Sequence, residues 1–242
     1  MLLVGFHAVI GRLKRAPETI TELYVDEARA DPRMAELLRR AEQAGVRVLQ
    51  VESRRLERLG RSRRHQGVVA FAEAAFEPPS LEKLIADLDG PALLLILDGV
   101  TDPRNLGACL RVADGAGAQA VIAPKDHACQ LTDVAVQTAS GAAESVPYVM
   151  VTNLSRAIDQ LQEAEIWTVG TCDDAPQSVF ELDLPGSIAW VLGAEGRGLR
   201  RLTRERCDFL GAIPMLGAVS SLNVSVAAGV VLYESVRRRL VL

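Results

Sequence analysis

The chain has 242 residues, 49% of them hydrophobic and 24% charged, and its formal net charge is −4. This composition excludes intrinsic disorder and a collagen-like repeat, and it predicts a globular protein of one large or two modest domains. No apolar run reaches the roughly 18 residues needed to cross a bilayer, and the first residues lack the pattern of a secretory signal. We therefore expect a cytosolic protein with no membrane partner.

The first third of the chain predicts a small α/β unit. We expect helices at 5–15 and 32–44 and strands at 22–25, 46–51 and 67–71. Pro78-Pro79 and Gly90-Pro91 then interrupt regular structure, with room between them for a short helix capped by Ser80. The sequence therefore predicts two domains, residues 1–75 and 91–242, joined by a linker at 76–90.

The second domain alternates apolar runs with amphipathic segments. We expect strands at 93–100, 120–124, 146–151, 166–171, 187–193 and 211–215, and helices at 105–114, 130–141, 154–164, 199–207 and from the serine-rich segment near 220 to about 238. The run LLLILDGV at 93–100 is typical of a strand buried on both faces. This alternation predicts an α/β fold with a mostly parallel sheet covered by helices on both faces.

Basic residues gather in the first domain. Residues 1–75 hold 14 Lys and Arg against 10 Asp and Glu, whereas the rest of the chain holds 13 against 21. Dense arginines offer forked donors to phosphate oxygens, although most charge runs are only solvated faces. We predict an RNA-binding cluster made of Arg54, Arg55, Arg58, Arg61, Arg63, Arg64, His65 and Gln66.

The four cysteines do not suggest a metal site or a disulfide framework. Cys109, Cys129, Cys172 and Cys207 are separated by 20, 43 and 35 positions, which matches neither paired metal ligands nor a small disulfide scaffold. We expect four reduced packing residues and no metal.

Ligands of parallel α/β sheets bind at the carboxyl ends of the strands, so three segments that follow strands deserve comparison. They are DGVTDPRNLGACLR at 98–111, GAEGRG at 193–198 and SSLNVSVAAG at 220–229. In the first, Asn105 suits a helix N-cap. The third carries more short polar side chains than the single one that a cap requires. GAGAQA at 115–120 matches a dinucleotide pattern but follows a helix and enters a strand, which disfavours a nicotinamide-dependent oxidoreductase.

Taken together, the three segments resemble the three motifs of the SpoU branch of the SPOUT RNA methyltransferases, in the same order. The stretches are LDGVTDPRNLGACLRVADGAGAQAVI, WVLGAEGRGLRRLTRERCD and IPMLGAVSSLNVSVAAGVVLYE. GFHAV near the start and HQGVVA at 65–70 also match the RNA-binding extension of this family, so the resemblance covers almost the whole chain. It is strongest to members that methylate the ribose 2′-oxygen of a guanosine in 23S rRNA; a tRNA or another rRNA nucleotide is the alternative target, and a noncatalytic RNA-binding protein is the alternative function.

The resemblance implies a C-terminal trefoil knot, S-adenosylmethionine as cofactor, an rRNA substrate and a homodimer formed through the C-terminal region. The implied cofactor contacts are Thr171, Gly193, Gly196, Ile213, Ser221 and Leu222. The implied catalytic residues are Asn105, Arg111, Glu195, Ser221 and Asn223. Arg111 is either a general base or a group that holds phosphate and stabilises alkoxide charge; a guanidinium is a poor base, which favours the second role.

Overall fold

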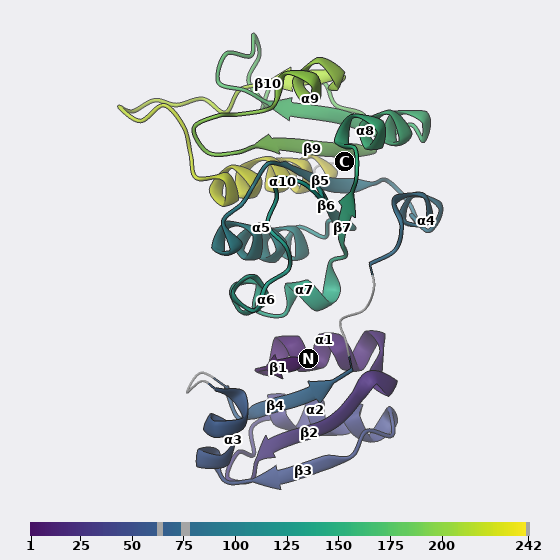
Figure 1. The fold of residues 1–242 in the computed structure, drawn as a ribbon, viewed down its shortest axis with the longest axis vertical. Helices are drawn as coiled ribbons and strands as arrows, with labels where there is room; N and C mark the ends of the chain where they lie inside the picture. The colour runs from purple at the N-terminus through teal and green to yellow at the C-terminus, as the bar shows by residue number, and fades with distance from the viewer. Residues whose placement is uncertain (62–64, 74–77, 241–242) are drawn as a thin grey trace. The chain divides into compact units, whose positions relative to one another are not determined.

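The computed structural model describes residues 1–61, 65–73 and 78–240. The chain forms two compact units, each with its own β-sheet (Figure 1). The first unit comprises Met1–Glu77 and Ser140–Ser145, and the second comprises Pro78–Ala139 and Val146–Leu242.

The first unit is a four-stranded sheet packed against helices. Its strands lie in the order β1-β4-β2-β3, with β2 and β3 parallel and the other neighbours antiparallel. The elements are β1 Leu2–Val4, α1 Phe6–Arg15, a 3-10 turn at Pro17–Thr19, β2 Ile20–Asp26, α2 Pro32–Gln43, β3 Val48–Val51, α3 Ser53–Gly60 and β4 Val68–Ala72; the short α7 (Ala142–Ser145) groups with them. Phe6, Met34 and Leu37 fill its core. The predicted small α/β unit is confirmed.

Four elements of this unit were not predicted: β1, the 3-10 turn, α3 and α7. Strand β1 is only three residues long and gains its stability by pairing with β4, far away in the chain. Helix α3 was missed in the arginine-rich run because only two of its apolar side chains, Leu56 and Leu59, three positions apart, pack in the core, which leaves too weak a helical pattern in the sequence. Three members of the predicted basic cluster, Arg54, Arg55 and Arg58, therefore lie on this helix and are exposed.

The second unit is built on a six-stranded sheet in the order β10-β8-β9-β5-β6-β7, and every neighbouring pair is parallel. The strands are β5 Leu93–Asp98, β6 Ala120–Pro124, β7 Tyr148–Val151, β8 Trp167–Thr171, β9 Ile188–Gly193 and β10 Phe209–Gly211. All six residues of β5 are buried, as expected of a central strand covered on both faces. The predicted parallel sheet is confirmed.

Helices cover both faces of this sheet. Helices α5 (Pro103–Gly115), α6 (Asp133–Ala139) and α10 (Val224–Leu240) pack together on one face. Helices α4 (Leu81–Ala86), α8 (Leu154–Glu163) and α9 (Arg201–Arg206) form the other group. Helix α4 lies inside the expected linker, has Ser80 as its N-cap, and buries Leu81 and Leu84 in the core of the unit.

The last strand lies earlier than predicted. The sequence favoured 211–215, but β10 ends at Gly211. Ala212 instead pairs with the connection that follows β8: its N–H donates to the carbonyl of Gln177, and its carbonyl accepts from Val179. Residues after Ala212 are consequently free to line a pocket at the edge of the sheet.

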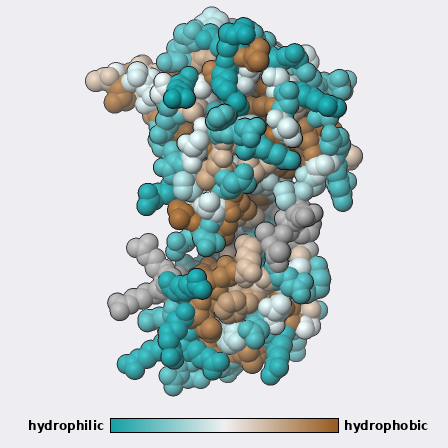
Figure 2. All heavy atoms as spheres, viewed as in Figure 1, coloured by the Kyte–Doolittle hydropathy of each residue, from teal (hydrophilic) through white to brown (hydrophobic). Residues whose placement is uncertain are grey.

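The surface of the second unit is mostly hydrophilic in the view of Figure 2, but hydrophobic side chains reach it at the tip of the segment that projects between β10 and α10. In this segment Leu216 is 98% exposed and Val219 is 64% exposed. Among the described residues, no helix is long and apolar enough to cross a membrane.

The cysteines are free thiols, as predicted. Burial, followed by the nearby charge of Glu195, raises the pKa of Cys109 to about 12. Burial likewise raises the pKa of Cys207 to about 12. Both thiols are therefore neutral and inert at neutral pH. Within the described ranges, no three His, Cys, Asp or Glu side chains gather as a metal site would require.

Candidate active site

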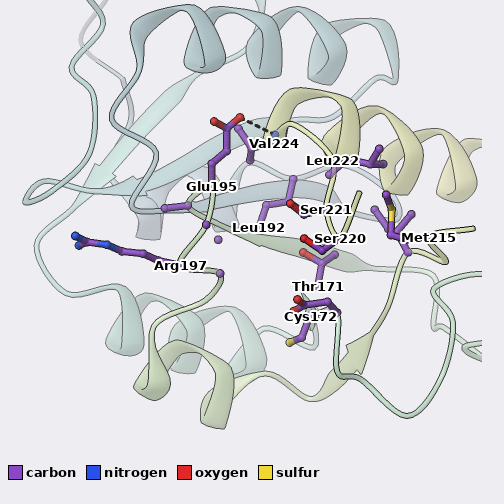
Figure 3. Close-up of a pocket in the computed structure, with 17 residues that line it drawn as sticks. Thr171, Cys172, Leu192, Glu195, Arg197, Met215, Ser220, Ser221, Leu222 and Val224 are labelled. Carbon is purple, nitrogen blue, oxygen red and sulfur yellow. Dashed lines mark hydrogen bonds between the residues drawn. The ribbon is translucent and has the colours of Figure 1, made fainter. Parts of the chain in front are cut away.

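A pocket of about 290 Å³ opens where β8 and β9 end, at the carboxyl edge of the second sheet (Figure 3). Its walls come from the end of β8, the loop after β9 and the segment between β10 and α10. The residues named as cofactor contacts all line it: Thr171, Gly193, Gly196, Ile213, Ser221 and Leu222. Segments separated by as many as fifty positions thus form one site.

Glycines shape the loop after β9. A side-chain carbon added to Gly193 would lie 2.0 Å from the carbonyl carbon of Gly198, so only glycine permits this close approach of two backbone segments. Gly196 has φ of 74° and Gly198 has φ of 64°, a left-handed conformation that favours glycine. The N–H of Gly198 closes the turn by donating to the carbonyl of Ala194 at 2.9 Å.

Three polar side chains from separate segments, those of Asn105, Glu195 and Asn223, meet in one cluster. Asn105 Nδ2 donates to Glu195 Oε1 at 3.2 Å, and Asn223 Nδ2 donates both to Glu195 Oε1 and, at 2.9 Å, to Asn105 Oδ1. The N–H of Val224 also donates to Glu195 Oε1, at 3.4 Å (Figure 3). The other carboxylate oxygen, Oε2, has no hydrogen-bond partner among the described residues. The Glu195 carboxylate is therefore held in place through Oε1, while Oε2 is left to accept a hydrogen bond from a ligand.

The start of α5 differs from the prediction. Asp102, not Asn105, caps the helix: its carboxylate accepts the N–H of Arg104 at 2.7 Å, and Pro103 takes the first helical position. The Asn105 amide is consequently released from capping and reaches Glu195. The cap of α10 is Asn223, whose Oδ1 accepts the N–H of Ser225 at 3.0 Å.

Arg111 is not part of this constellation. It lies six positions after Asn105 in α5, which is about 240° further around the helix, so the two side chains leave on different faces. Arg111 is exposed, does not line the pocket, and makes no ion pair in the described part of the chain. Ser221 does line the pocket and is exposed there.

The basic cluster of the first unit is partly an exposed surface. Arg54, Arg55 and Arg58 are exposed on α3, and Arg61 follows in the left-handed conformation. Gln66 is also exposed. By contrast His65 is only 6% exposed, and its Nδ1 accepts the N–H of Gly67 at 3.0 Å, so its imidazole shapes a turn. Arg63 and Arg64 lie outside the described residues.

One ion pair at the site escaped the sequence analysis. Asp98, the last residue of β5, is buried and accepts hydrogen bonds from the N–H of Arg200 at 3.0 Å and from its Nε at 2.5 Å. This pair fixes the end of the glycine loop to the neighbouring strand. The available signal was a lone carboxylate ending a wholly apolar strand, since such a buried charge requires a partner.

The parallel sheet, the pocket at its carboxyl edge and the polar cluster beside it define a doubly wound α/β protein with a small-ligand site. Residues 92–233 match the model of the SpoU rRNA methylase family, and residues 2–78 match the model described as RNA 2′-O ribose methyltransferase substrate binding. The chain belongs to the SpoU rRNA methylase family.

Relatives of known name cover nearly the whole chain. The 23S rRNA (guanosine-2′-O-)-methyltransferase RlmB of Bordetella pertussis is 56% identical over 98% of this chain and 97% of its own. The protein of the same name from Ralstonia nicotianae is 54% identical over 98% and 96%. Among solved structures, the SpoU methyltransferase AviRb from Streptomyces viridochromogenes in complex with AdoMet has a TM-score of 0.77 and 27% identity, covering 100% of this chain and 91% of that one.

Proposed function

We propose that this protein transfers a methyl group from S-adenosylmethionine to the ribose 2′-hydroxyl of a specific guanosine in 23S rRNA. The observation that carries the proposal is the pocket at the carboxyl edge of the sheet, beside the cluster of Asn105, Glu195 and Asn223. The names of relatives with 54–56% identity over nearly the full chain give the same reaction and substrate. Because the proposed substrate is ribosomal RNA, we propose that the protein acts in the cytoplasm.

The lining of the pocket fits the cofactor. The loop after β9 packs tightly on itself at Gly193 and so forms a backbone wall, and Leu192, Ile213 and Leu222 supply apolar contact. Exposed polar groups, including the Ser221 hydroxyl, complete the lining. Bound S-adenosylmethionine would supply an electrophilic methyl group. The residues of the chain would then have to orient the ribose hydroxyl and manage its proton.

The polar cluster meets that requirement. Glu195 Oε1 is occupied by amide donors, whereas Oε2 is free to accept a hydrogen bond from the ribose 2′-hydroxyl. This contact would orient the 2′-oxygen toward the methyl group that a bound cofactor would supply, and Oε2 would take up the proton that the hydroxyl releases. Asn105 and Asn223 would position Glu195, and Ser221 would contact both the ribose and the cofactor. We assign Arg111 to holding the adjacent phosphate and stabilising alkoxide charge.

Because Arg111 lies away from the pocket of its own chain, we propose that a homodimer brings the two together. Helix α10 exposes Val226 (51%) and Tyr233 (51%), and the loop before it exposes Leu216. The hydroxyl of Tyr233 would lie 3.0 Å from a side-chain carbon on Gly115, which is one turn beyond Arg111 on α5. Exposed apolar side chains on α10, with Tyr233 close to the end of α5, support a dimer in which Arg111 serves the site of the second copy.

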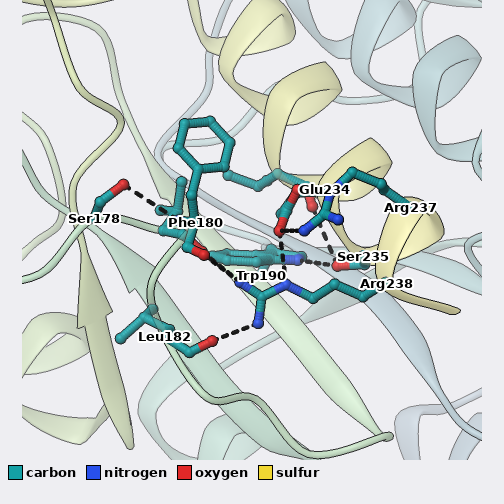
Figure 4. Close-up of polar contacts among 10 residues, drawn as sticks. Ser178, Phe180, Leu182, Trp190, Glu234, Ser235, Arg237 and Arg238 are labelled. Atoms are coloured by element: carbon teal, nitrogen blue, oxygen red, sulfur yellow. Dashed lines mark hydrogen bonds and ion pairs between the residues drawn. The ribbon is translucent and has the colours of Figure 1, made fainter. Parts of the chain in front are cut away.

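We also propose the trefoil knot for the C-terminal part. The connection between β8 and β9 is held from two sides: Ala212 pairs with it, and Arg238 of α10 donates to the carbonyls of Val179 and Leu182 (Figure 4). Trp190 Nε1 of β9 also donates to Ser235 Oγ of α10, at 2.8 Å. The contacts of Ala212 and α10 with the connection between β8 and β9 support a C-terminal segment that is threaded through the fold.

We further propose that residues 1–75 bind the RNA substrate, that 76–90 connect the domains and that 91–242 catalyse the transfer.

The function is tested with labelled S-adenosylmethionine and a transcript of 23S rRNA, followed by mapping of 2′-O-methylated nucleotides. We expect label on one guanosine; an unlabelled 23S transcript would refute the proposed function.

Arg111→Ala should abolish turnover, whereas Arg111→Lys should retain a measurable fraction of it. Near-complete loss in Arg111→Lys with normal RNA binding would contradict the phosphate role. Mixing Arg111→Ala with Glu195→Gln should restore activity if two chains share a site.

A further inference from the structure

Most arginines of the second unit contact an acidic side chain or a backbone carbonyl of the same unit. Asp98 holds Arg200, and the arginines of α9 and α10 each contact a carboxylate or a backbone carbonyl. The pairs are Arg201 with Glu205, Arg204 with Asp174, Arg206 with Asp159, Arg237 and Arg238 with Glu234, and Arg239 with the carbonyls of Ala92 and Gly186.

The remaining basic side chains of this unit are exposed and have no hydrogen-bond or ion-pair partner in the described ranges. They are Lys83, Arg104, Arg111, Lys125, Arg156 and Arg197. Three of them lie at the carboxyl edge of the sheet. Arg104, Lys125 and Arg197 follow the ends of β5, β6 and β9, whereas Lys83 and Arg156 lie on α4 and α8.

The loop that leads into Arg104, at the start of α5, meets the loops that carry Lys125 and Arg197 at Gly99. A side-chain carbon on Gly99 would lie 3.7 Å from Ala194 Cβ, in the loop after β9, and 3.9 Å from the carbonyl oxygen of His127, in the loop after β6. The N–H of Cys129 donates to the carbonyl of Val100 at 2.8 Å, which joins the loops after β5 and β6. The exposed cations therefore belong to one continuous edge.

This edge adjoins the polar cluster. Arg104 precedes Asn105, and Arg197 is two positions after Glu195. Arg197 belongs to the lining of the pocket, and its side chain extends outward from the rim (Figure 3). Besides Glu195, two acids lie nearby: Asp102 is engaged as the cap of α5, and Asp126 is exposed between Lys125 and His127. Unpaired guanidinium and ammonium groups beside a site for a ribose are suited to phosphate oxygens.

We infer that the cationic edge, defined as Arg104, Lys125 and Arg197, binds the phosphate backbone of the substrate RNA next to the methylated nucleotide. This inference rests on the proposed function and extends it from the basic face of α3 to a second RNA contact on the catalytic unit. Contacts to phosphate position a nucleic acid without reading its sequence. The edge therefore sets affinity and register, and it leaves the choice of base to other groups.

The test compares two matched double variants. Arg104→Ala/Lys125→Ala removes one arginine and one lysine from the edge, and Lys83→Ala/Arg156→Ala removes the same pair of charges from α4 and α8. Binding to the 23S transcript is measured over a range of KCl concentrations. The logarithm of affinity falls as the logarithm of salt concentration rises, and the loss of two phosphate contacts should make this slope less steep by about 1.4 to 1.8. The edge variant should bind roughly tenfold more weakly, and the control within about twofold of the wild type.

Equal behaviour of the two double variants would overturn the inference. Asp126→Asn removes the exposed acid and should tighten binding of the 23S transcript. Weaker binding of the transcript by this variant would also count against the inference. Cofactor affinity and thermal stability should stay unchanged in the edge variant, which separates an RNA contact from a damaged pocket. In methyl transfer, KM for RNA should rise with kcat within about twofold. If the wild type transfers no methyl group, the proposed function fails, while the binding comparison still decides the role of the edge.

Discussion

Replacing Gly193 by alanine should disable the cofactor pocket. The new carbon would lie 2.0 Å from the carbonyl carbon of Gly198 and 2.4 Å from the backbone nitrogen of Leu199, against an ordinary contact distance of at least 3.4 Å. Relief requires the two backbone segments to separate by more than 1 Å, because no flexible side chain is available to move. A shift of that size in the pocket wall should weaken binding of S-adenosylmethionine at least about 100-fold, or about 2.8 kcal/mol.

The assay is calorimetric titration of Gly193→Ala with S-adenosylmethionine, together with thermal unfolding. Overpacking should also cost about 1–3 kcal/mol of stability. Gly217→Ala is the matched control, since a carbon at Gly217 meets nothing within 4 Å; it should bind the cofactor as the wild type does. If Gly193→Ala binds within about threefold of the wild type, the close approach of the two segments is not what shapes the pocket.

Two further predictions concern the anchoring of α10 (Figure 4). Hydrogen bonds from Arg237, followed by Arg238, lower the pKa of Glu234 from 4.5 to about 2, so this carboxylate stabilises the fold above pH 4.5 and loses that effect as the pH falls toward 2. Glu234→Gln should therefore cost about 1–2 kcal/mol in urea unfolding at pH 7 and much less near pH 2.5; an equal cost at both would contradict the ion-pair origin. Ser235→Ala leaves the buried Trp190 N–H, which donates to Ser235 at 2.8 Å, without a partner and should lower the free energy of unfolding by about 1–3 kcal/mol, with cofactor binding retained; unchanged stability would refute this reading.

Short-range patterns were sufficient for the main elements of the fold. The apolar run at 93–98 is a fully buried central strand, and the alternation of strands and helices became a wholly parallel sheet covered on both faces. The pocket lining was reached through the family resemblance, because the motifs carry residues such as Gly193 and Ser221 together. The end of the last strand was missed, since the pairing of Ala212 with Gln177 depends on a distant connection.

The sequence by itself determined the class of fold, the three loops and the residue types available at the edge of the sheet, because strand burial and helix capping depend on neighbouring residues. Only the tertiary structure decided which oxygen of Glu195 is free, that Asp98 holds Arg200, that His65 is buried, and that Arg111 faces away from its own pocket. The physical reason is that hydrogen bonds and ion pairs form between groups that meet in space. Loops after neighbouring parallel strands bring such groups together, however far apart they lie along the chain.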